Sequence, residues 1–489
     1  MEALETHSKK SIKKICMNIF IMNKFIQFIN RKRELEFLES QLKKPASFTV
    51  IYGRRRVGKS ELLRKFLAKK KSIFLFATQE VEKELAESFS LEFAEHFGDE
   101  TLRINPFAEF AQLMEYLKGK DIGGIVLAID EFPYLVDANR AIPSIIQKYW
   151  DMHFRAKGLH IVLCGSSIGA METEVLGSKS PLYGRRTGQW RVDPLPFGEF
   201  MKFFPESGME KLVEFYSITG GIPLYILEFS EGKTAYENAK EAVATRGSLL
   251  YQESDIILKE ELREPKTYFS LLKEMSRGKN TLNELSNALG AERTALGRYV
   301  DTLIELDLVE AEKPAAAKEK ARNTRYVLRD NYFKFWFRFV YPFKKDLNSF
   351  IFEGFGKKFR KDFNAHVGRQ FEGVCREAIR VQNPIGSADA GRWWGAYREN
   401  GERKECEIDV LSINKGKGQV LFGECKWKEN ADWEEILRKL KGKAGHFAWN
   451  LGKREEQYAI FAKSFSGRKC RERNVHLYGL EGLRKLFSK

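Results

Sequence analysis

Gly53-Arg-Arg-Arg-Val-Gly-Lys-Ser60 is the stretch that decides the fold, because it has the G-x-x-x-x-G-K-[ST] spacing of a phosphate-binding loop. The apolar run 48–52 precedes it as an expected strand, and residues 61–66 follow it with a helical pattern. In that setting Gly53 and Gly58 let the backbone N–H groups face a phosphate at a helix N-terminus. A glycine-containing turn that shares the spacing by chance is the alternative.

The loop residues have distinct expected roles around a bound nucleotide. Lys59 is expected to reach the β- and γ-phosphates of ATP, and the Ser60 hydroxyl is expected to ligate Mg²⁺. The other residues expected around the phosphates are Gly53, Arg54, Arg55, Arg56, Val57 and Gly58.

An acidic motif follows about 70 residues later. Gly124-Ile-Val-Leu-Ala-Ile-Asp-Glu131 is an apolar run that ends in two acids, which is typical of a buried parallel strand with carboxylates at its C-terminal edge. Ligand sites of open α/β sheets lie at that edge. We expect Asp130 to hold Mg²⁺ and Glu131 to polarise the attacking water, which predicts a hydrolase. Two solvated acids at an exposed strand end are the alternative.

Two later segments carry further candidates. Residues 160–167 read as a buried strand that ends in small polar residues, so Ser166 or Ser167 could sense the γ-phosphate; ordinary helix capping by a serine is the alternative. Arg185 and Arg186 follow a glycine, and an exposed guanidinium there could act as an arginine finger. The alternative is that these two arginines form surface salt bridges or contact DNA phosphates.

These segments together resemble the archaeal-type ATPase family, in the AAA+/STAND branch of the P-loop NTPases. The resemblance covers residues 28–340 and rests on Asn30-Arg-Lys-Arg-Glu-Leu35, the phosphate loop, Ile129-Asp-Glu131, Leu182-Tyr-Gly-Arg-Arg186, Gly220-Gly-Ile-Pro223 and Phe335-Trp-Phe-Arg-Phe-Val340. It implies that Arg31 and Glu34 lie near the base or a domain junction and that Pro223 approaches the adenine. It also implies that Arg185 or Arg186 acts across the subunit interface of a homo-oligomer.

The composition indicates a folded protein with a polyanionic partner. Of the 489 residues 43% are hydrophobic, and the net charge of +16 favours nucleic acid, most simply DNA, over general solubility alone. The six cysteines form no C-x-x-C pair, so neither a zinc site nor a disulfide scaffold is expected and a reducing cytoplasm is the simplest location. No apolar run reaches transmembrane length, so no membrane partner is expected.

The pattern along the chain predicts an α/β protein. Expected strands near 48–52, 73–77, 125–129 and 159–164 alternate with helical stretches, which predicts a parallel sheet. The expected parts are an N-terminal extension at 1–27 (with Met17 or Met22 as alternative starts), a P-loop ATPase core at 28–200, a helical lid at 201–260, a winged-helix domain at 261–342 and a nuclease-like domain at 343–489.

The predicted winged helix rests on periodicity and turn residues. Residues 281–289 and 293–306 each carry one apolar face and are separated by a glycine turn, which predicts a helix-turn-helix. Residues 308–310 and 324–328 fit a two-stranded wing around a lysine-bearing loop. The arginines that could face DNA are Arg293 and Arg298. A protein–protein or regulatory module is the alternative.

The C-terminal part predicts a second chemistry. Residues 407–412 alternate in polarity, with Asp409 on the polar face near the start of a strand, and the next strand carries Glu424 and Lys426 on one side. A hairpin can bring Asp409 beside them, and two carboxylates with a lysine can hold Mg²⁺ and orient water for phosphodiester hydrolysis. Glu372, on an upstream amphipathic helix, could add a third carboxylate.

This order of residues resembles the D…E-x-K triad of the PD-(D/E)XK nuclease superfamily over residues 365–485. The resemblance implies that Asp409 and Glu424 bind the metal ion and that Lys426 positions the water. We therefore expect an ATPase coupled to a DNA-associated, nuclease-like domain. A STAND-type regulatory switch that acts through protein contacts, with a catalytically inactive nuclease-like domain, is the alternative, and a DNA-handling factor without cleavage is a third hypothesis.

Overall fold

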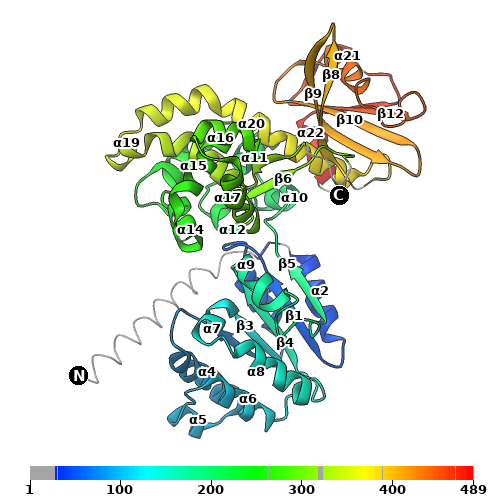
Figure 1. The fold of residues 1–489 in the computed structure, drawn as a ribbon. Coiled ribbons are helices and arrows are strands. Elements are labelled where there is room, and N and C mark those ends of the chain that lie inside the picture. The colour runs from blue at the N-terminus through cyan, green and yellow to red at the C-terminus, as the bar shows by residue number, and fades with distance from the viewer. Residues whose placement is uncertain are drawn as a thin grey trace.

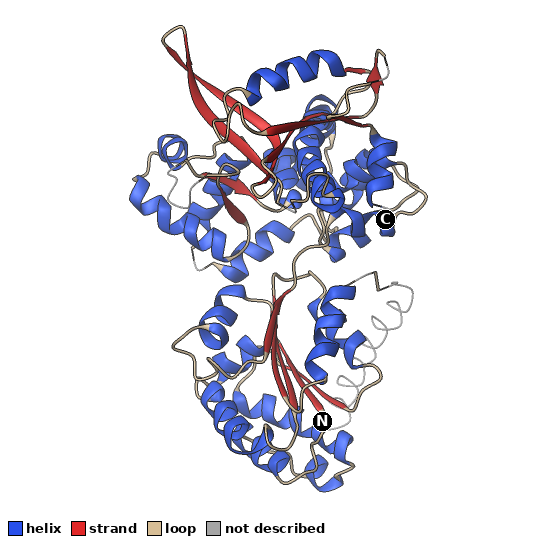
Figure 2. Cartoon of the chain, turned by 90° about the vertical axis from the view of Figure 1, so that its right-hand side faces the viewer, coloured by secondary structure: helices blue, strands red, loops and turns tan. Residues whose placement is uncertain are grey.

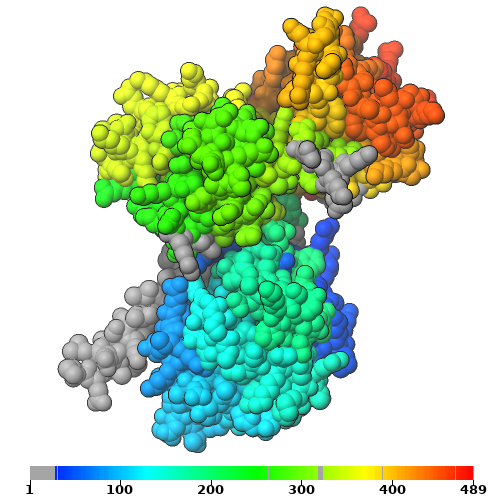
Figure 3. All heavy atoms as spheres, viewed as in Figure 1, coloured from blue at the N-terminus to red at the C-terminus, as the bar shows by residue number. Residues whose placement is uncertain are grey.

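The chain forms two bodies, one above the other in Figure 1. The computed structural model describes residues 28–29, 31–262, 264–317, 323–387, 389–468 and 470–487. The expected extension 1–27, Asn30 and part of the expected wing loop (318–322) lie outside these residues. In the space-filling view of Figure 3 the lower body is coloured blue to teal and the upper body green to red.

The lower body is built on a five-stranded parallel sheet with the strand order β2-β3-β4-β1-β5. The strands are β1 (Ser47–Tyr52), β2 (Ser72–Phe76), β3 (Val126–Asp130), β4 (His160–Gly165) and β5 (Gly188–Arg191). The first four confirm the strands expected from the sequence. β5 was not expected, because Gly188-Gln-Trp-Arg191 has no apolar run.

Helices cover both faces of this sheet, as Figure 2 shows. They are α2 (Lys32–Leu42), α3 (Lys59–Leu67), α4 (Glu82–Phe97), α5 (Glu100–Ile104), α6 (Phe110–Lys118), α7 (Phe132–Ala138), α8 (Ile142–Tyr149) and α9 (Ile168–Met171). Neighbouring residues of a strand point to opposite faces. Val50 therefore packs with Phe93 of α4, whereas Ile51 packs with Leu63 of α3, and both residues of β1 are fully buried.

The lower part of the upper body is mainly helical. Its helices are α10 (Phe197–Phe200), α11 (Met209–Thr219), α12 (Pro223–Leu227), α13 (Ala235–Asn238), α14 (Glu253–Glu261), α15 (Pro265–Ser276), α16 (Leu282–Leu289), α17 (Arg293–Glu305), α18 (Asn331–Phe335) and α19 (Lys344–Asn348). The expected helix-turn-helix residues form α16 and α17, with a capping box at Thr281 and Glu284 and a left-handed Gly290 after α16. The two expected wing strands pair antiparallel as β6 (Val309–Glu312) and β7 (Arg325–Leu328).

A second five-stranded sheet forms the end of the upper body, with the order β14-β12-β10-β9-β8. Its elements are β8 (Gly391–Glu399), β9 (Glu402–Asn414), β10 (Gln419–Lys426), α21 (Trp433–Ala444), β12 (Glu455–Ala462), β14 (Val475–Tyr478) and α22 (Leu480–Phe487), with the short pair β11 (Ala431–Asp432) and β13 (Phe465–Ser466). β9 pairs antiparallel with β8 and β10, whereas β12 pairs parallel with β10 and β14. The expected hairpin of the two acidic strands is therefore present.

The long helix α20 (Glu353–Gln382) joins the helical part to this sheet. Near its start Phe359 packs against Phe335 of α18, and further along Phe371 packs against Trp427, which follows β10. One apolar cluster thus runs from the helical part into the inner face of the C-terminal sheet, while α21 covers the outer face with Leu437 and Leu440. α20 therefore packs both with the helical part and with the inner face of the C-terminal sheet, and the boundary near residue 343 stays a prediction.

Candidate functional site

A pocket of about 480 Å³ opens at the C-terminal edge of the parallel sheet, next to the predicted phosphate loop. Its lining includes Arg31, Arg55, Arg56, Val57, Gly58, Lys59, Ser60, Glu131, Ser166, Pro223 and Glu260. Most of the residues that the sequence singled out for nucleotide binding therefore lie around one pocket. This volume is in the range of about 300–1,000 Å³ that is typical of small-molecule sites.

The glycines of the loop have the conformations that the motif requires. Gly58 has φ 91° and Gly53 has φ 148°. A Cβ on Gly53 would lie 2.3 Å from the carbonyl oxygen of Val192, which follows β5, so no larger residue fits there. The loop thus passes close to the neighbouring backbone and leads directly into α3.

Lys59 lies inside the loop. Its Nζ donates hydrogen bonds to the carbonyl oxygens of Gly53 and Arg54, each at 2.8 Å. Burial lowers the pKa of the Lys59 ammonium. The ammonium is therefore already held where phosphate oxygens would approach. A bound phosphate would supply a negative charge that offsets the loss of hydration on burial.

Asp130 ends β3 as a fully buried carboxylate. Its Oδ1 accepts a hydrogen bond from the Glu131 N–H at 3.0 Å, whereas its Oδ2 is buried without a strong donor among the described residues, the Cys164 thiol of β4 being a weak one. Such a weakly satisfied buried oxygen leaves room for a ligand or water. Asp130 and the Ser60 hydroxyl therefore fit a hydrated Mg²⁺ in the chemistry of their donors.

Glu131 has a left-handed backbone with φ 51°, directly before α7. Its Oε2 accepts hydrogen bonds from the Ser166 hydroxyl at 2.7 Å and from the Ser166 N–H at 3.2 Å. Ser167, by contrast, caps α9 by accepting from the Ala170 N–H. The two readings of this serine pair thus apply to different residues: Ser167 caps a helix, and Ser166 faces the pocket.

Each of the three arginines of the loop contacts an acid of the upper body, which the sequence did not predict. Arg54 forms an ion pair with Asp330 at 2.8 Å, and both side chains are at most 8% exposed. Burial, the largest effect, lowers the pKa of the Arg54 guanidinium, but Asp330, Tyr225 and Asp307 together outweigh it and the pKa is raised. Asp330 also caps α18 through the N–H groups of Tyr332 and Phe333, so one carboxylate serves both contacts.

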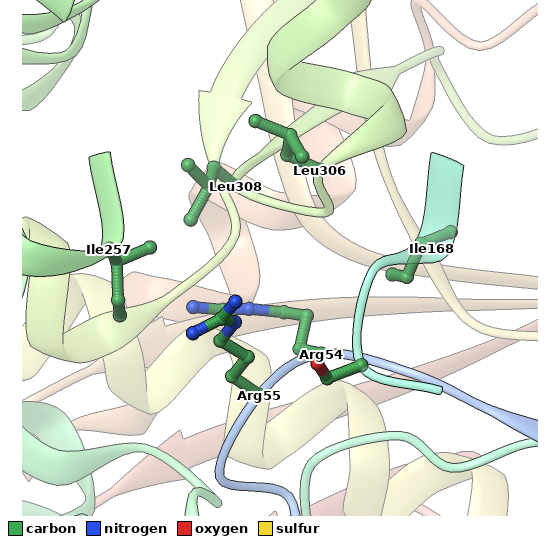
Figure 4. A pocket seen from close by; sticks show the side chains of 7 residues that line it. Arg54, Arg55, Ile168, Ile257, Leu306 and Leu308 are labelled. Carbon is green, nitrogen blue, oxygen red and sulfur yellow. The ribbon is translucent and has the colours of Figure 1, made fainter. Parts of the chain in front are cut away.

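The next two arginines reach α14. Arg55 contacts Glu260 at 2.5 Å and the Tyr134 hydroxyl at 2.9 Å, and Arg56 contacts the fully buried Glu253. Figure 4 shows Arg54 and Arg55 in a second cavity beside the loop, which Ile168 of the lower body borders together with residues of the upper body such as Ile257. The loop therefore touches the upper body through three consecutive side chains. The only sequence signal was the run of arginines itself.

Other residues named by the resemblance take defined places. Arg31 donates hydrogen bonds to Val57 O at 2.7 Å and to Asp193 O at 2.8 Å, and it pairs with Glu34 at 2.9 Å, so it lies at a junction beside the loop. The Cγ atom of Pro223 lies 3.9 Å from the position of a Cβ on Gly58. Both residues line the pocket, and the approach of Pro223 to an adenine stays a prediction.

Arg185 and Arg186 do not line the pocket in the described part of the chain. Arg185 pairs with Asp151 at 3.0 Å and also donates to two backbone carbonyls, and Arg186 donates to Leu176 O at 3.1 Å. Both guanidinium groups are half-buried and held within their own chain. An action across a subunit interface stays a prediction.

The second predicted site lies on the β9–β10 hairpin. β9 begins at Glu402 and not near Glu407, so Asp409 lies in the middle of a long strand. The pairing of β8 with β9 shifts by one residue next to Asp409, which marks a bulge, and the Asp409 Oδ2 accepts a hydrogen bond from the Cys425 N–H of β10 at 2.9 Å. The bulge thus turns the carboxylate toward β10.

Neighbouring charged groups and burial together change the pKa of Asp409. Burial, followed by the nearby carboxylates of Glu424 and Glu372, raises the pKa of Asp409 to about 7. Lys426 donates to Glu424 Oε1 at 2.8 Å, as expected for side chains on one side of the strand. Lys443 of α21, which was not predicted for this site, donates to both Glu424 oxygens at 2.8 and 2.9 Å.

Asp409, Glu424 and Lys426 are therefore brought together, but two ammonium groups already neutralise Glu424. Glu372, whose charge acts on Asp409, contacts Arg392 and lies 3.8 Å from Arg376, so its carboxylate is already paired with arginines. Within the described ranges, no group of three or more Asp, Glu, His or Cys side chains is arranged to hold a metal ion.

The chain resembles known proteins over almost its whole length. Residues 28–229 match an ATPase domain found predominantly in Archaea, and residues 336–436 match a domain of archaeal and bacterial proteins of unknown function. An uncharacterized protein of Methanocaldococcus jannaschii is 32% identical over 454 residues, which cover 90% of this chain and 97% of that protein. An uncharacterized ATP-binding protein of the same organism is 53% identical over 47 residues, 9% of this chain and 80% of that protein.

Among solved structures, the Walker-type ATPase of Pyrococcus abyssi is similar with a TM-score of 0.49 and 20% identity, over 65% of this chain and 97% of that one. The fold and the pocket define a P-loop ATPase. The chain belongs to the family in which an archaeal-type ATPase domain is followed by this C-terminal domain of unknown function. It binds and hydrolyses ATP.

None of the helices in the described part of the chain combines the length and the apolar character needed to cross a bilayer.

Proposed function

We propose that ATP binding and hydrolysis in the lower body change its contact with the upper body, and that the C-terminal domain acts on nucleic acid under this control. The observation that carries the coupling is the triple contact of Arg54, Arg55 and Arg56 with acids of the upper body. A nucleotide at the phosphate loop would move these side chains or weaken their ion pairs, because phosphates and carboxylates compete for the same guanidinium groups.

The ATPase roles follow from the pocket. Ser60 and Asp130 would hold Mg²⁺, which neutralises charge on the phosphates when it is bound. Lys59 would bind the phosphates. Once the Glu131 carboxylate has released its hydrogen bond with Ser166, it would orient the attacking water. Pro223 would contact the adenine, and Arg185 or Arg186 would act in a neighbouring subunit of a homo-oligomer.

The nuclease assignment of the C-terminal domain rests on Asp409, Glu424 and Lys426. Their proximity supports a metal-dependent site in which Asp409 and Glu424 hold the ion and Lys426 positions the water or stabilises the developing phosphorane charge. Lys443 would have to release one or both oxygens of Glu424 for this chemistry. The winged-helix residues Arg293 and Arg298, both exposed, would contact DNA phosphates.

One observation favours a second candidate function. Glu424 carries two ammonium contacts and Asp409 has a raised pKa, so the pair has little negative charge left to attract Mg²⁺ at neutral pH. This balance fits a STAND-type switch with an inactive nuclease-like domain that signals through protein contacts.

Cleavage of single-stranded, duplex and branched DNA with Mg²⁺ or Mn²⁺, with and without ATP, tests the proposal. Cleavage by the wild type should fall by roughly 10²–10³ in Asp409→Ala. ATP hydrolysis should stay unchanged in that variant, because Asp409 and the phosphate loop lie in different bodies. Cleavage by Asp409→Ala at the wild-type rate would show that the site is elsewhere, and no cleavage by the wild type under any metal condition would favour the regulatory switch.

A further inference from the structure

A polar cavity of about 570 Å³ lies between the β6–β7 hairpin and α20 in the upper body. Eight Lys or Arg side chains and five glutamates line it. It is separate from the nucleotide pocket, because the two share no lining residue. The chemistry of this cavity depends on which of these charges are already paired.

Most of the glutamates are neutralised by contacts around the cavity wall. Glu372 and Glu407 contact Arg392, and Glu407 also contacts Arg325 at 3.0 Å. The Glu377 carboxylate accepts hydrogen bonds from two backbone N–H groups of α10, at 2.9 and 3.0 Å. The remaining acids of the lining are Glu312, 3.8 Å from Arg392, and the exposed Glu310.

Four cations of the lining lack such a partner, and one of them, Arg380, donates instead to the carbonyl oxygen of Ala390. No carboxylate lies within 4.0 Å of Lys334, Arg338 or Arg369 among the residues that the structure describes, although the carboxylates of Asp330 and Asp362 act on this group at longer range. The Lys334 ammonium donates only to the amide oxygens of neutral side chains, those of Asn331 at 3.2 Å and Gln370 at 3.0 Å. One of its three donors is therefore left for a ligand.

Other cations of the lining also repel members of this group. Burial, and next the charge of Arg369, lowers the pKa of Arg338. Burial lowers the pKa of Lys334 to about 8, with Arg376 and Arg392 adding to the effect. Holding like charges together without an anion costs free energy, and an anion among them would recover it.

Space is left between these side chains. Gly373 lies one turn after Arg369 on α20 and lines the cavity, and a Cβ there would meet only the tip of Arg376, at 4.0 Å. A glycine in the middle of a helix costs about 1 kcal/mol relative to alanine. At this position it widens the cavity next to the cations.

We propose that this cavity binds a phosphate monoester through Lys334, Arg338 and Arg369, either a free mononucleotide or the 5′-phosphate end of a nucleic-acid strand. A phosphate monoester carries nearly two negative charges at neutral pH and three acceptor oxygens, which suits three converging cations better than a single carboxylate does. Arginine forks bind phosphate with two parallel hydrogen bonds. The volume is in the range of sites that hold ligands of nucleotide size.

Isothermal titration calorimetry of the full chain tests this site. Lys59→Ala serves as the background, so that the phosphate loop does not contribute, and the probes are AMP, a 5′-phosphorylated dT10 and the same dT10 with a 5′-hydroxyl. The affinity for a phosphorylated probe should fall about tenfold or more when Lys334→Gln or Arg369→Gln is added, because each removes a charge-assisted hydrogen bond. Lys361→Gln, which removes a charge from the exposed side of α20, is the matched control and should change little.

The probes distinguish the two sources of the phosphate. Binding of AMP as tight as that of the phosphorylated strand indicates a free mononucleotide, and tighter binding of the strand indicates a nucleic-acid end. Equal binding of the two dT10 probes together with no binding of AMP would overturn the proposal, as would unchanged affinity in both Lys334→Gln and Arg369→Gln. Arg369 is exposed, so its variant should unfold at the wild-type temperature, and ATP hydrolysis in the Lys59 wild-type background reports separately on the proposed function.

Discussion

The phosphate loop and the Asp409 hairpin are both predicted catalytic sites, but their charges are arranged in opposite ways. At the loop, among the residues that the structure describes, Asp130 has a buried oxygen without a strong donor and Lys59 donates hydrogen bonds only to backbone carbonyls, so both residues have capacity for a new ligand. At the hairpin, Glu424 is already held by Lys426 and Lys443. The charged groups of the loop are therefore available to a ligand, whereas the carboxylate of the hairpin is neutralised by ammonium groups of the chain itself.

This difference gives the two sites different needs. A weakly satisfied buried carboxylate is costly unless a cation or water joins it, so the loop site favours a bound cation or water. A neutralised carboxylate is stable without one, so the hairpin suits either a regulated nuclease or an inactive domain. Experiments that remove one charge at a time separate these cases.

The largest effect is expected at the phosphate loop. Glu131→Gln should keep ATP binding and lower hydrolysis by roughly 10²–10⁴, because the amide cannot accept a proton from water. Lys59→Ala should lose binding itself, and the exposed Glu84→Gln of α4 serves as the control. Nucleotide titration measures ATP binding, and steady-state phosphate release measures hydrolysis. Wild-type turnover in Glu131→Gln would assign the base to another residue.

The contact between the two bodies is expected to come next. Asp330→Ala should lower the free energy of unfolding by about 3–5 kcal/mol, since it leaves the buried Arg54 without its partner and removes the cap of α18. Asp137→Ala removes an exposed pair with Arg140 and should cost at most about 1 kcal/mol. Urea unfolding monitored by fluorescence measures both variants, and equal small losses would show that the Arg54 contact does not hold the bodies together.

A smaller, pH-dependent effect is expected at the hairpin. The pKa of Asp409 is about 7 in the folded chain and near 4 when unfolded, so the folded state binds the proton more tightly. The free energy of unfolding should therefore fall as the pH rises from about 4 to about 7, and stay low above that range. Asp409→Asn cannot ionise, so its stability relative to wild type should be higher at pH 8 than at pH 5, by roughly 1–3 kcal/mol.

Urea unfolding at the two pH values measures this difference, and the exposed Asp301→Asn should show none. Mn²⁺ binding favours ionised carboxylates and would reduce the difference if the hairpin holds a metal. A pH profile that is unchanged by metal would point to the inactive domain, and the same stability gain at both pH values would contradict the raised pKa.

The smallest effect concerns nucleic acid. Duplex binding should weaken steeply with salt, and Arg293→Gln should reduce the log–log slope by about 0.9 if this residue contacts one phosphate. Arg64→Gln on α3 of the lower body is the control. Fluorescence anisotropy at several salt concentrations measures the slope. Binding that does not depend on salt would rule out an electrostatic contact with DNA.

The parts of the fold that the sequence predicted are those fixed by local rules. The first four strands of the parallel sheet are apolar runs, and α16 is set by its capping box and by Gly290, so periodicity and turn residues suffice. β5 has no apolar run, and the extra residues at the start of β9 are polar, so neither showed in the pattern. Their strand conformation comes from pairing with neighbouring strands.

By itself the sequence determined the phosphate loop and its acidic partner strand, because each is encoded in adjacent residues. Only the tertiary structure decided the partners of the charges. Arg54 meets Asp330 across 276 positions of the chain, and Lys443 reaches Glu424 from a helix that the pattern placed only nearby. Ion pairs depend on distance in space and on burial, and neither is written in the spacing of residues along the chain.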